Sequence, residues 1–491
     1  MKQVPSLRCR TLNSCAVNPA GDFVLYWMTA FRRLTYNFSL DRAAEWSRRL
    51  GRPILILEAL RCDYPWASRR FHRFVMQGMS DNRTQASLSG HGYFPYVELS
   101  PGYGTGLIES LAAKAAVIVT DDFPCFFLPG MIKAVARRVP VFMEAVDSNG
   151  LLPMRATDQV FPTAYAFRRF LQKSLTPHLT DMPHSDPLSD PELPRLHALP
   201  DEIVARWPVA ESELLRCHPA IFDGLPIDQT VREASMTGGP TAAKQCLDEF
   251  LKRRISIYAE ERNQPDVEAA SGLSPYLHFG HISAQEIFIR LASDEGWKVD
   301  DLADAKVTRG SRSGWWGMSD NGESFLDELV TWRELGFNMC WQRADFDKYE
   351  SLPDWAQKTL EKHSRDHRPY VYSLDELRNG ETHDKLWNAA QYQLVSEGRM
   401  HNYLRMLWGK KILEWSASPR DALSAMIELN NRFAVDGRNP NSYSGIFWVL
   451  GRYDRAWGPE RSIFGKIRYM TSENTAKKLS LTKYLEKYSE V

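Results

Sequence analysis

Residues 386–415 read LWNAAQYQLVSEGRMHNYLRMLWGKKILEW, and residues 427–448 read IELNNRFAVDGRNPNSYSGIFW. Trp408 and Trp415 lie seven residues apart, so one helix over 400–415 places both indoles on the same face. Single polar residues interrupt the apolar sequence, and we expect each of them to be buried with a polar partner. This pattern is typical of an all-helical pocket that holds a cofactor.

Helical periodicity continues through most of the sequence after residue 236. The segments with helix-period apolar positions are 242–262, 282–292, 323–344, 384–397, 400–415 and 420–433. Nine of the fifteen tryptophans lie between residues 315 and 448, which directs attention to this half for the chemistry. We therefore predict a large all-α domain over residues 236–491.

The N-terminal part has a different pattern. Five short runs rich in β-branched and aromatic residues predict strands at 23–29, 53–58, 93–98, 116–120 and 140–146. Helix-like segments at 40–50 and 106–115 lie between them. Strands that alternate with helices predict a doubly wound parallel sheet, so residues 1–175 form an α/β domain. A proline-rich, polar connector follows over residues 176–235.

The glycine-rich segment GYGTG at 102–106 precedes a predicted helix and invites interpretation as a phosphate-binding loop. An ordinary glycine turn is the stronger interpretation, because the spacing of a dinucleotide-binding motif is absent.

Composition excludes several classes of protein. Lys plus Arg and Asp plus Glu both number 61, so no bulk positive charge attracts nucleic acid, and any DNA contact needs a local patch. Seven scattered cysteines without a CxxC pair argue against a disulfide framework or a metal site. The sequence shows no signal peptide and no apolar run of membrane-spanning length, so we expect a soluble, cytoplasmic protein.

Several motifs carry a family resemblance. WNAAQ begins at Trp387, H-x-Y-L-R-M-x-W-x-K-K-I-L-E-W at His401, D-G-R-x-P-N at Asp436, and DRAW is followed by FGKIRYM in 451–470. Together they resemble the class II cyclobutane pyrimidine dimer photolyases, a branch of the photolyase/cryptochrome superfamily, over nearly the whole chain. The resemblance implies a photolyase-like fold, with FAD in the helical domain.

The segment 271–283, SGLSPYLHFGHIS, contains Ser274 before Pro275, which predicts an N-cap with proline at the first helical position. A well-capped helix without a ligand is the alternative. The resemblance assigns this loop to the FAD pyrophosphate. The implied contact residues are Tyr258, Ser271, Gly272, Leu273 and Ser274. Gly272 stands where the family usually has Asn.

The resemblance places three further polar residues next to the flavin ring. Arg405 and Asp436 could be a plain buried ion pair, whereas the family places the matching pair against the flavin. Asn430 matches a residue near flavin N5. Its amide oxygen can accept a hydrogen bond from a protonated N5, and its nitrogen can donate to an unprotonated one. Arg333 is a further expected cofactor contact.

Glu328 and Trp332 are four residues apart and share one helical face. A buried Glu is most often a member of a salt bridge, here with Arg333. The resemblance implies that Glu328 hydrogen-bonds the pyrimidine dimer and that Trp332 and Trp448 pack against the flipped lesion. A carboxylic acid kept protonated in a desolvated site could donate to the dimer as it gains charge. Indoles offer the flat apolar area that a base taken out of the stack requires.

Trp387, Trp408 and Trp415 have two interpretations. Aromatic residues at helical spacing are usually core. Their intervals of 21 and 7 residues, however, match the class II tryptophan triad, which implies an electron relay that refills the flavin. Such a relay needs an ionised indole near solvent.

The segment 451–470 carries interleaved basic and aromatic residues. Its predicted DNA contacts are Arg452, Arg455, Lys466 and Arg468. A solvated basic loop is the alternative. By resemblance, this loop enters the gap that the flipped dimer leaves in the duplex.

The chain also departs from the family pattern. Asn402, Asn439 and Ser442 replace Gly, Asp and Gly, and the loop before Asp454 is shorter. These positions border the implied flavin and lesion sites, so affinity, flavin redox state or repair could differ.

The leading hypothesis is a monomeric, light-dependent enzyme that repairs UV-damaged DNA containing pyrimidine dimers, with FAD and an optional antenna chromophore of deazaflavin type. The alternative is a cryptochrome-like blue-light photoreceptor that uses the same flavin and tryptophans. A helical DNA-binding scaffold without flavin is the third interpretation.

Overall fold

The computed structural model describes residues 3–489, which form two compact units. The first unit contains Met1–Asp158, Ser174–Asp248 and Leu273–Val299. The second contains Gln159–Lys173, Glu249–Gly272 and Asp300–Val491. The chain therefore passes between the units several times, whereas the sequence predicts continuous domains with boundaries at 175 and 236.

Side-chain contacts explain this interleaving. In the second unit, the Arg168 guanidinium donates to both carboxylate oxygens of Asp327, at 2.8 and 3.0 Å. In the first unit, Arg33 donates to the Gly280 carbonyl at 3.0 Å, and Gln285 donates to the Gly150 carbonyl at 2.6 Å. These long-range contacts, which local periodicity does not report, assign each segment to its unit.

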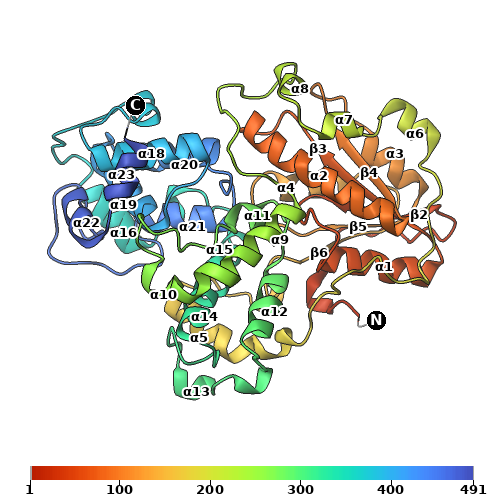
Figure 1. The fold of residues 1–491 in the computed structure, drawn as a ribbon, viewed down its shortest axis with the longest axis horizontal. Helices are drawn as coiled ribbons and strands as arrows, with labels where there is room; N and C mark the ends of the chain where they lie inside the picture. The colour runs from red at the N-terminus through yellow and green to blue at the C-terminus, as the bar shows by residue number, and fades with distance from the viewer. Residues whose placement is uncertain (1–2, 490–491) are drawn as a thin grey trace. The chain divides into compact units, whose positions relative to one another are not determined.

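The first unit is built on a six-stranded sheet in the order β1-β6-β5-β2-β3-β4 (Figure 1). The strands are β1 Cys9–Thr11, β2 Phe23–Met28, β3 Ile54–Leu60, β4 Gly92–Val97, β5 Ala115–Asp121 and β6 Met143–Val146. The five predicted strands are parallel, and β1, which the sequence did not suggest, pairs antiparallel with β6. The order reverses between β5 and β2, as expected for the predicted doubly wound sheet.

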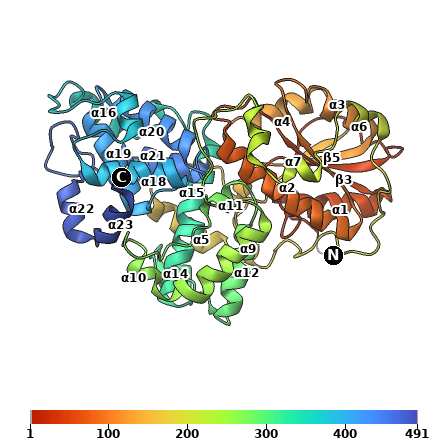
Figure 2. The same ribbon diagram turned by 45° about the horizontal axis from the view of Figure 1, so that its top comes forward.

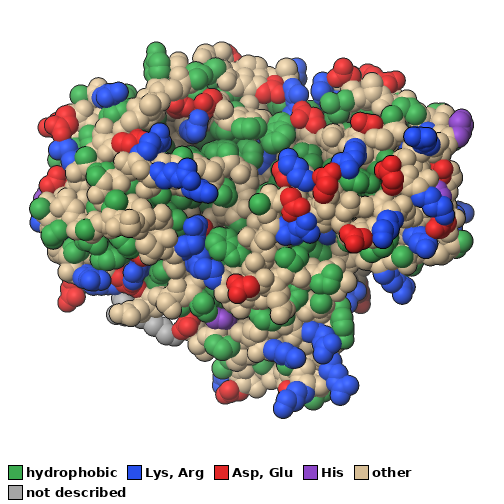
Figure 3. Space-filling view, turned by 180° about the vertical axis from the view of Figure 1, so that it is seen from behind, with side chains coloured by type: hydrophobic (Ala, Val, Ile, Leu, Met, Phe, Trp, Pro, Cys, Tyr) green, Lys and Arg blue, Asp and Glu red, His purple; other side chains and the backbone are tan. Residues whose placement is uncertain are grey.

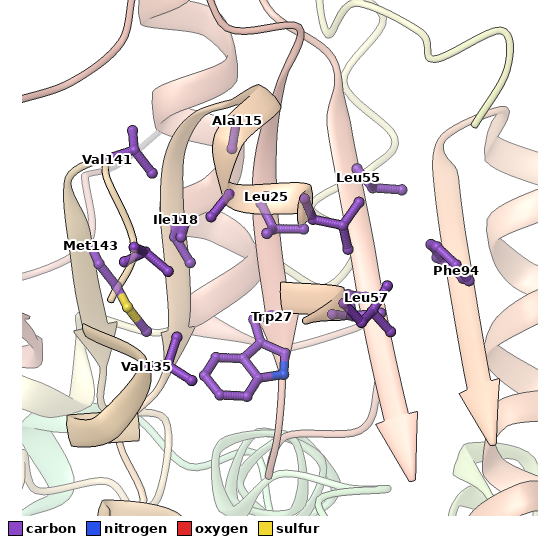
Figure 4. Close-up of a cluster of buried hydrophobic side chains, with 14 of the residues drawn as sticks. Leu25, Trp27, Leu55, Leu57, Phe94, Ala115, Ile118, Val135, Val141 and Met143 are labelled. Carbon is purple, nitrogen blue, oxygen red and sulfur yellow. The ribbon is translucent and has the colours of Figure 1, made fainter. Parts of the chain in front are cut away.

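Helices cover both faces of this sheet. The helices of the first unit are α1 Phe38–Leu50, α2 Arg69–Ser89, α3 Leu107–Lys114, α4 Leu128–Ala136, α6 Asp201–Arg206, α7 Ser212–Leu215, α8 Pro219–Asp223, α9 Pro240–Glu249, α11 Ser274–His278 and α12 Ala284–Asp294. On one face, α3 and α4 pack on Leu25, Leu57 and Ile118 (Figure 4). On the other, α1 packs on Tyr26 and Val119. Alternating side chains of each strand therefore enter two separate cores.

The GYGTG segment forms a turn rather than a phosphate loop. Gly102 and Gly106 have positive φ, and the Gly104 N–H donates to the Glu98 carboxylate at 3.0 Å. This donor is therefore already used within the protein.

The second unit is helical. Its helices are α5 Ala164–Ser174, α10 Tyr258–Glu261, α13 Ala305–Thr308, α14 Asp320–Leu326, α15 Arg333–Gln342, α16 Asp354–Lys362, α17 Leu374–Asn379, α18 Lys385–Glu397, α19 Asn402–Trp415, α20 Pro419–Phe433, α21 Pro440–Val449, α22 Ser472–Lys478 and α23 Thr482–Tyr488. Helices α18 to α21 pack side by side in Figures 1 and 2. None of the helices within residues 3–489 is both long and apolar enough to cross a lipid bilayer.

Local sequence explains where several of these helices begin. Ser418 accepts from the Asp421 N–H before α20, and Asn439 accepts from the Asn441 N–H before α21. In both helices, proline follows the cap, where its missing N–H costs nothing.

Two predicted long helices are interrupted by wider or tighter turns. The segment 323–344 divides into α14, the π-helical η7 Asp327–Trp332, and α15. The segment 242–262 divides into α9, the π-helical η4 Phe250–Arg254, the 3-10 turn η5 Ile255–Ile257, and α10. Such π-helical turns frequently occur at functional sites, and η7 contains both Glu328 and Trp332.

We expect Asp121→Ala to unfold the first unit more easily. The Asp121 carboxylate accepts the backbone N–H groups of Thr29, Ala30 and Phe31 at 2.7–2.9 Å, and the Tyr26 hydroxyl at 2.8 Å. Its loss leaves buried donors unpaired, at about 3 kcal/mol or more. Urea unfolding measures the change. Asp22→Ala, at an exposed position, should cost less than about 0.5 kcal/mol; equal effects of the two substitutions would contradict the assignment.

Candidate active site

The close approach of α15 and α21 brings two predicted site residues together. A Cβ atom at Gly336 would lie only 2.7 Å from Ser444 Oγ, so glycine permits this approach. The Trp332 and Trp448 rings then lie 5.9 Å apart between centroids, at an interplanar angle of 50°. Both indoles are partly exposed although most of their neighbours are buried. They can therefore offer an apolar surface to a ligand.

Glu328 lies one helical turn before Trp332 and is also partly exposed. Its carboxylate forms an ion pair with Arg262 at 2.5 Å. The alternative partner considered from the sequence, Arg333, is buried and instead lies over the Phe337 ring at 4.5 Å. Glu328 is thus held by a cation, and not in the unpaired, apolar environment expected for a proton donor. The sequence analysis did not identify Arg262, because this residue is far from Glu328 in the sequence and meets it only in the folded chain.

Tyr258, itself an expected cofactor residue, lies beside this ion pair. Its ring packs edge-on against Phe250 and Phe325, at 5.6 and 5.5 Å. Arg262 lies over the same ring at 5.6 Å. Burial, assisted by the negative charge of Glu328, raises the pKa of the Tyr258 phenol to about 12. The phenol therefore stays neutral and is available as a hydrogen-bond donor.

Helices α19, α20 and α21 bring the next group together. Arg405 on α19 donates to the Asp436 carboxylate at 3.2 Å, and this pair keeps some exposure. Asn430 on α20 donates through its amide nitrogen to Ser442 Oγ on α21 at 2.6 Å. Ser442 and Trp448 belong to the same helix, about 9 Å apart along its axis. One helix therefore connects the residues expected beside a flavin with the indole pair.

The loop 271–274 differs from its predicted geometry. Ser271 and Gly272 belong to the second unit, and Leu273 and Ser274 to the first. The N-cap of α11 is Leu273, without a side-chain capping bond, so Ser274 is the first helical residue and Pro275 the second. The predicted N-cap at Ser274 is therefore wrong by one residue, because either of the first two positions tolerates proline. Gly272 has φ +73°, which glycine adopts more readily than the Asn usual in the family.

The three relay candidates are all buried. The Trp387 and Trp415 rings lie 5.5 Å apart, and the Trp387 indole N–H donates to the Trp408 carbonyl at 3.0 Å. The Trp408 indole N–H donates to Gln391 at 2.8 Å. Trp415 also contacts Tyr372 and His383, at 5.4 and 5.3 Å between centroids. Because His383 is exposed, solvent lies just beyond this last indole.

The segment 451–470 is only partly the basic loop that the sequence predicts. Arg455 and Arg468 are exposed and flank Trp457, with their guanidinium carbons 4.8 and 5.4 Å from its ring centroid. Lys466 is exposed as well.

Acidic and basic side chains are interspersed across the face of the molecule that Figure 3 shows, in keeping with the zero net charge of the chain.

Arg452 has a different environment from these three cations. It is 2% exposed, donates to the Phe346 carbonyl at 2.7 Å and to Ser351, and lies 3.8 Å from the Phe447 ring centroid. Burial lowers the pKa of its guanidinium to about 10. The predicted DNA contact of Arg452 is therefore replaced by a structural role.

The sequence of this chain is similar to those of several known proteins. The chain is 32% identical over 482 residues to the deoxyribodipyrimidine photo-lyase of Methanothermobacter thermautotrophicus, covering 98% of this chain and 97% of that protein. It is 31% identical to the deoxyribodipyrimidine photo-lyase of Potorous tridactylus and 32% identical to that of Oryza sativa, each over 97% of this chain and 83% and 89% of the relatives. No family model matches the chain.

A solved structure supports the fold. The crystal structure of a bacterial class III photolyase from Agrobacterium tumefaciens superposes with a TM-score of 0.65 and 17% sequence identity, covering 97% of this chain and 86% of that one. The predicted fold class is thereby confirmed.

We expect Lys410 to make stability depend on pH. Lys410 is 1% exposed on α19 and donates to the Val449 carbonyl at 2.5 Å. Burial lowers the pKa of its ammonium from 10.5 to about 7, with smaller opposing effects of Asp454 and Arg468. Between these values the unfolded chain binds more protons, so its contribution to stability rises with pH, by about 3 kcal/mol from pH 7 to pH 9.5.

Lys410→Met should remove this rise, which urea unfolding at the two pH values measures. Lys358→Met, at an exposed position of α16, should keep it. The same pH dependence in Lys410→Met and wild type would contradict the assignment.

Proposed function

The chain belongs to the deoxyribodipyrimidine photo-lyase family, and from this premise we propose that it is a class II photolyase that repairs cyclobutane pyrimidine dimers in UV-damaged DNA with FAD and light. The observation that best supports the proposal is the position of α21. This helix carries Trp448, which contacts Trp332, and Ser442, which binds Asn430. A lesion packed against the two indoles and a flavin beside Asn430 would thus both contact α21.

The residues around Asn430 fit a flavin. Arg405 and Asp436 form a half-buried ion pair that can both donate to and accept from the polar edge of the ring. The amide oxygen of Asn430 accepts no hydrogen bond from residues 3–489, so it is available to a ligand. Bound FAD, in its reduced form, would supply the photoexcitable electron that opens the cyclobutane ring and would receive it back, without net redox change.

The remaining FAD contacts follow from the resemblance. The expected set is Tyr258, Ser271, Gly272, Leu273, Ser274 and Arg333. Tyr258 is the neutral donor described above, and Gly272 has the positive φ that lets a backbone turn closely around a ligand. The antenna chromophore of deazaflavin type stays an expectation from the family resemblance.

In this proposal Trp332 and Trp448 stack against the dimer taken out of the duplex. Glu328 hydrogen-bonds a pyrimidine of the dimer, and Arg262 holds the carboxylate in place by the 2.5 Å ion pair. As a carboxylate, Glu328 accepts from the N–H of the pyrimidine ring, so it orients the base before the electron arrives. Arg455, Lys466 and Arg468 position DNA phosphates around Trp457.

Trp408, Trp387 and Trp415 form the proposed relay by which a bound flavin regains an electron after oxidation. Their packing is compatible with either a relay or a core. The contact of Trp415 with exposed His383 provides the end near solvent that a relay needs.

A cryptochrome-like photoreceptor is the alternative function. It would use the same flavin and tryptophans but has no need of lesion contacts. The partly exposed group of Glu328, Trp332 and Trp448 favours repair.

The decisive experiment incubates the purified protein with an oligonucleotide that contains a cyclobutane thymine dimer, in blue light and in darkness. Repair in light alone supports the proposal. A coloured protein that leaves the dimer intact in light would favour the photoreceptor, and a protein that takes up no flavin would exclude both functions.

We expect Glu328→Ala to bind dimer-containing DNA about as tightly as wild type but to split the dimer with a quantum yield about tenfold lower, because a positioned hydrogen-bonding group is lost. Binding is measured by gel shift and splitting per absorbed photon by dimer absorbance. Glu361→Ala, at an exposed position of α16, is the control. An unchanged quantum yield would refute the role of Glu328.

We expect Trp408→Phe to repair normally when the flavin is reduced chemically, but to lose light-driven reduction of oxidised FAD. Phenylalanine is far harder to oxidise than tryptophan, so the relay stops. Flavin absorbance under illumination with a thiol reductant measures the effect. Trp207→Phe is the control, because Trp207 is also buried, lies in the first unit and donates its indole N–H to a carbonyl, that of Tyr103. Undiminished photoreduction in Trp408→Phe would disprove the relay.

A further inference from the structure

Helix α23 packs beside α18 in the second unit (Figures 1 and 2). It contributes two buried tyrosines, Tyr484 and Tyr488, whose hydroxyls both meet the amide of Gln393 on α18. Tyr484 donates to Gln393 Oε1 at 2.8 Å, and Gln393 Nε2 donates to the Tyr488 hydroxyl at 3.2 Å. The same Gln393 oxygen accepts the backbone N–H of His401 at 3.1 Å. Gln393 therefore joins α23 to the start of α19.

Groups at the two ends of this network fix the direction of its hydrogen bonds. The His401 backbone N–H can only donate, so the Gln393 atom that faces it is the oxygen. At the other end, Tyr488 donates to the Glu397 carboxylate at 2.7 Å, and a carboxylate can only accept. Burial acts to raise the pKa of Glu397, but hydrogen bonds, first of all that of Lys487, lower it to about 2. Glu397 therefore stays ionised, and the network has one arrangement of its protons.

The start of α19 depends on this network. His401 is the N-cap of α19 and makes no side-chain capping bond. N–H groups at the start of a helix have no acceptor within it, so Gln393 supplies one from another helix. Arg405, which the resemblance places against the flavin, follows one turn later, and its N–H donates to the His401 carbonyl at 2.9 Å. The position of Arg405 is thus connected to α23 through Gln393.

The N-terminal end of α23 is bonded to a second segment. Asp266 accepts the Ser480 hydroxyl and the Tyr484 N–H, each at 2.8 Å. The N-cap of α23, Leu481, makes no side-chain capping bond, so Asp266 caps this helix from elsewhere in the chain. Ser271, expected beside the FAD pyrophosphate, follows Asp266 by five residues. Helix α23 is therefore bonded to two segments that lead to expected FAD contacts.

Arg399 joins these two segments to each other. It donates to the Glu397 carboxylate at 3.0 Å and to the Glu268 carboxylate at 2.7 Å. Because the Glu268 side chain is 69% exposed, this bridge alone contributes little. Tyr484 and Tyr488 are only 4% and 5% exposed, so their hydroxyls are the stronger restraint.

We propose that Tyr484 and Tyr488 are positioning residues that retain FAD by holding the segments 266–271 and 397–405 in place. The inference rests on the proposed function, because it places FAD beside Arg405 and Ser271. The two tyrosines act through Gln393 and Asp266 and need not touch the cofactor. Loss of either hydroxyl loosens the start of α19, so FAD leaves faster although the aromatic packing is kept.

The test compares FAD-loaded wild type, Tyr484→Phe and Tyr488→Phe. Each protein is diluted into buffer, and the rise in fluorescence of free FAD gives the rate of release. We expect each variant to release FAD about fivefold faster than wild type, the size of one lost hydrogen bond. Hydrogen exchange of the His401 amide should accelerate by a similar factor, because its acceptor Gln393 is less restrained.

Lys483→Ala and Tyr93→Phe are the controls. Lys483 is exposed on the same helix, so its loss should leave the release rate unchanged. Tyr93 donates to the Glu58 carboxylate at 2.6 Å in the first unit, so Tyr93→Phe should lower the free energy of unfolding without faster release. Release from Tyr484→Phe and Tyr488→Phe at the wild-type rate overturns the inference. Equally fast release from Tyr93→Phe overturns it as well, since general destabilisation would then explain the effect.

Light-dependent repair is measured on the same wild-type preparation. A wild type that holds FAD but leaves the dimer intact overturns the proposed function alone. A wild type that takes up no FAD overturns both the proposed function and the role of α23.

Discussion

The close approach of α15 and α21 is the constraint on which the candidate site depends. Gly336 has no room for a Cβ atom, because Ser444 Oγ and the Pro440 carbonyl oxygen would lie 2.7 and 2.9 Å from it. The approach places Trp332 against Trp448. The same helix α21 carries Ser442, which accepts a hydrogen bond from Asn430 on α20. A wider separation of the helices would alter the proposed lesion surface and the proposed flavin surface together.

Buried polar groups specify the interior of both units. In the first unit, Asp121 accepts three backbone N–H groups at the end of β5. In the second, Arg452 and Lys410 each donate to a backbone carbonyl near the end of a helix or loop. Each group would be costly to bury alone, so each requires one arrangement of its neighbours. Apolar contacts supply the driving force, and these bonds select a single packing.

The sequence predicted the elements better than their partners. All five predicted strands and the doubly wound order are present, because a strand buried on two faces needs a continuous apolar run. The short edge strand β1 escaped prediction, since pairing with β6 and not hydrophobicity defines it. The π-helical turns η4 and η7 escaped as well, because a wider turn leaves almost the same apolar spacing as an α-helix.

The sequence by itself determined the two classes of architecture, the helices that carry the indoles, and the family, because periodicity and short motifs are properties of neighbouring residues. Only the tertiary structure decided that Arg262 pairs with Glu328, that Arg452 is buried, and that Asn430 donates to Ser442. Each of these facts joins residues from segments that are separate in the sequence. Their contact depends on how the helices pack, which no local pattern records.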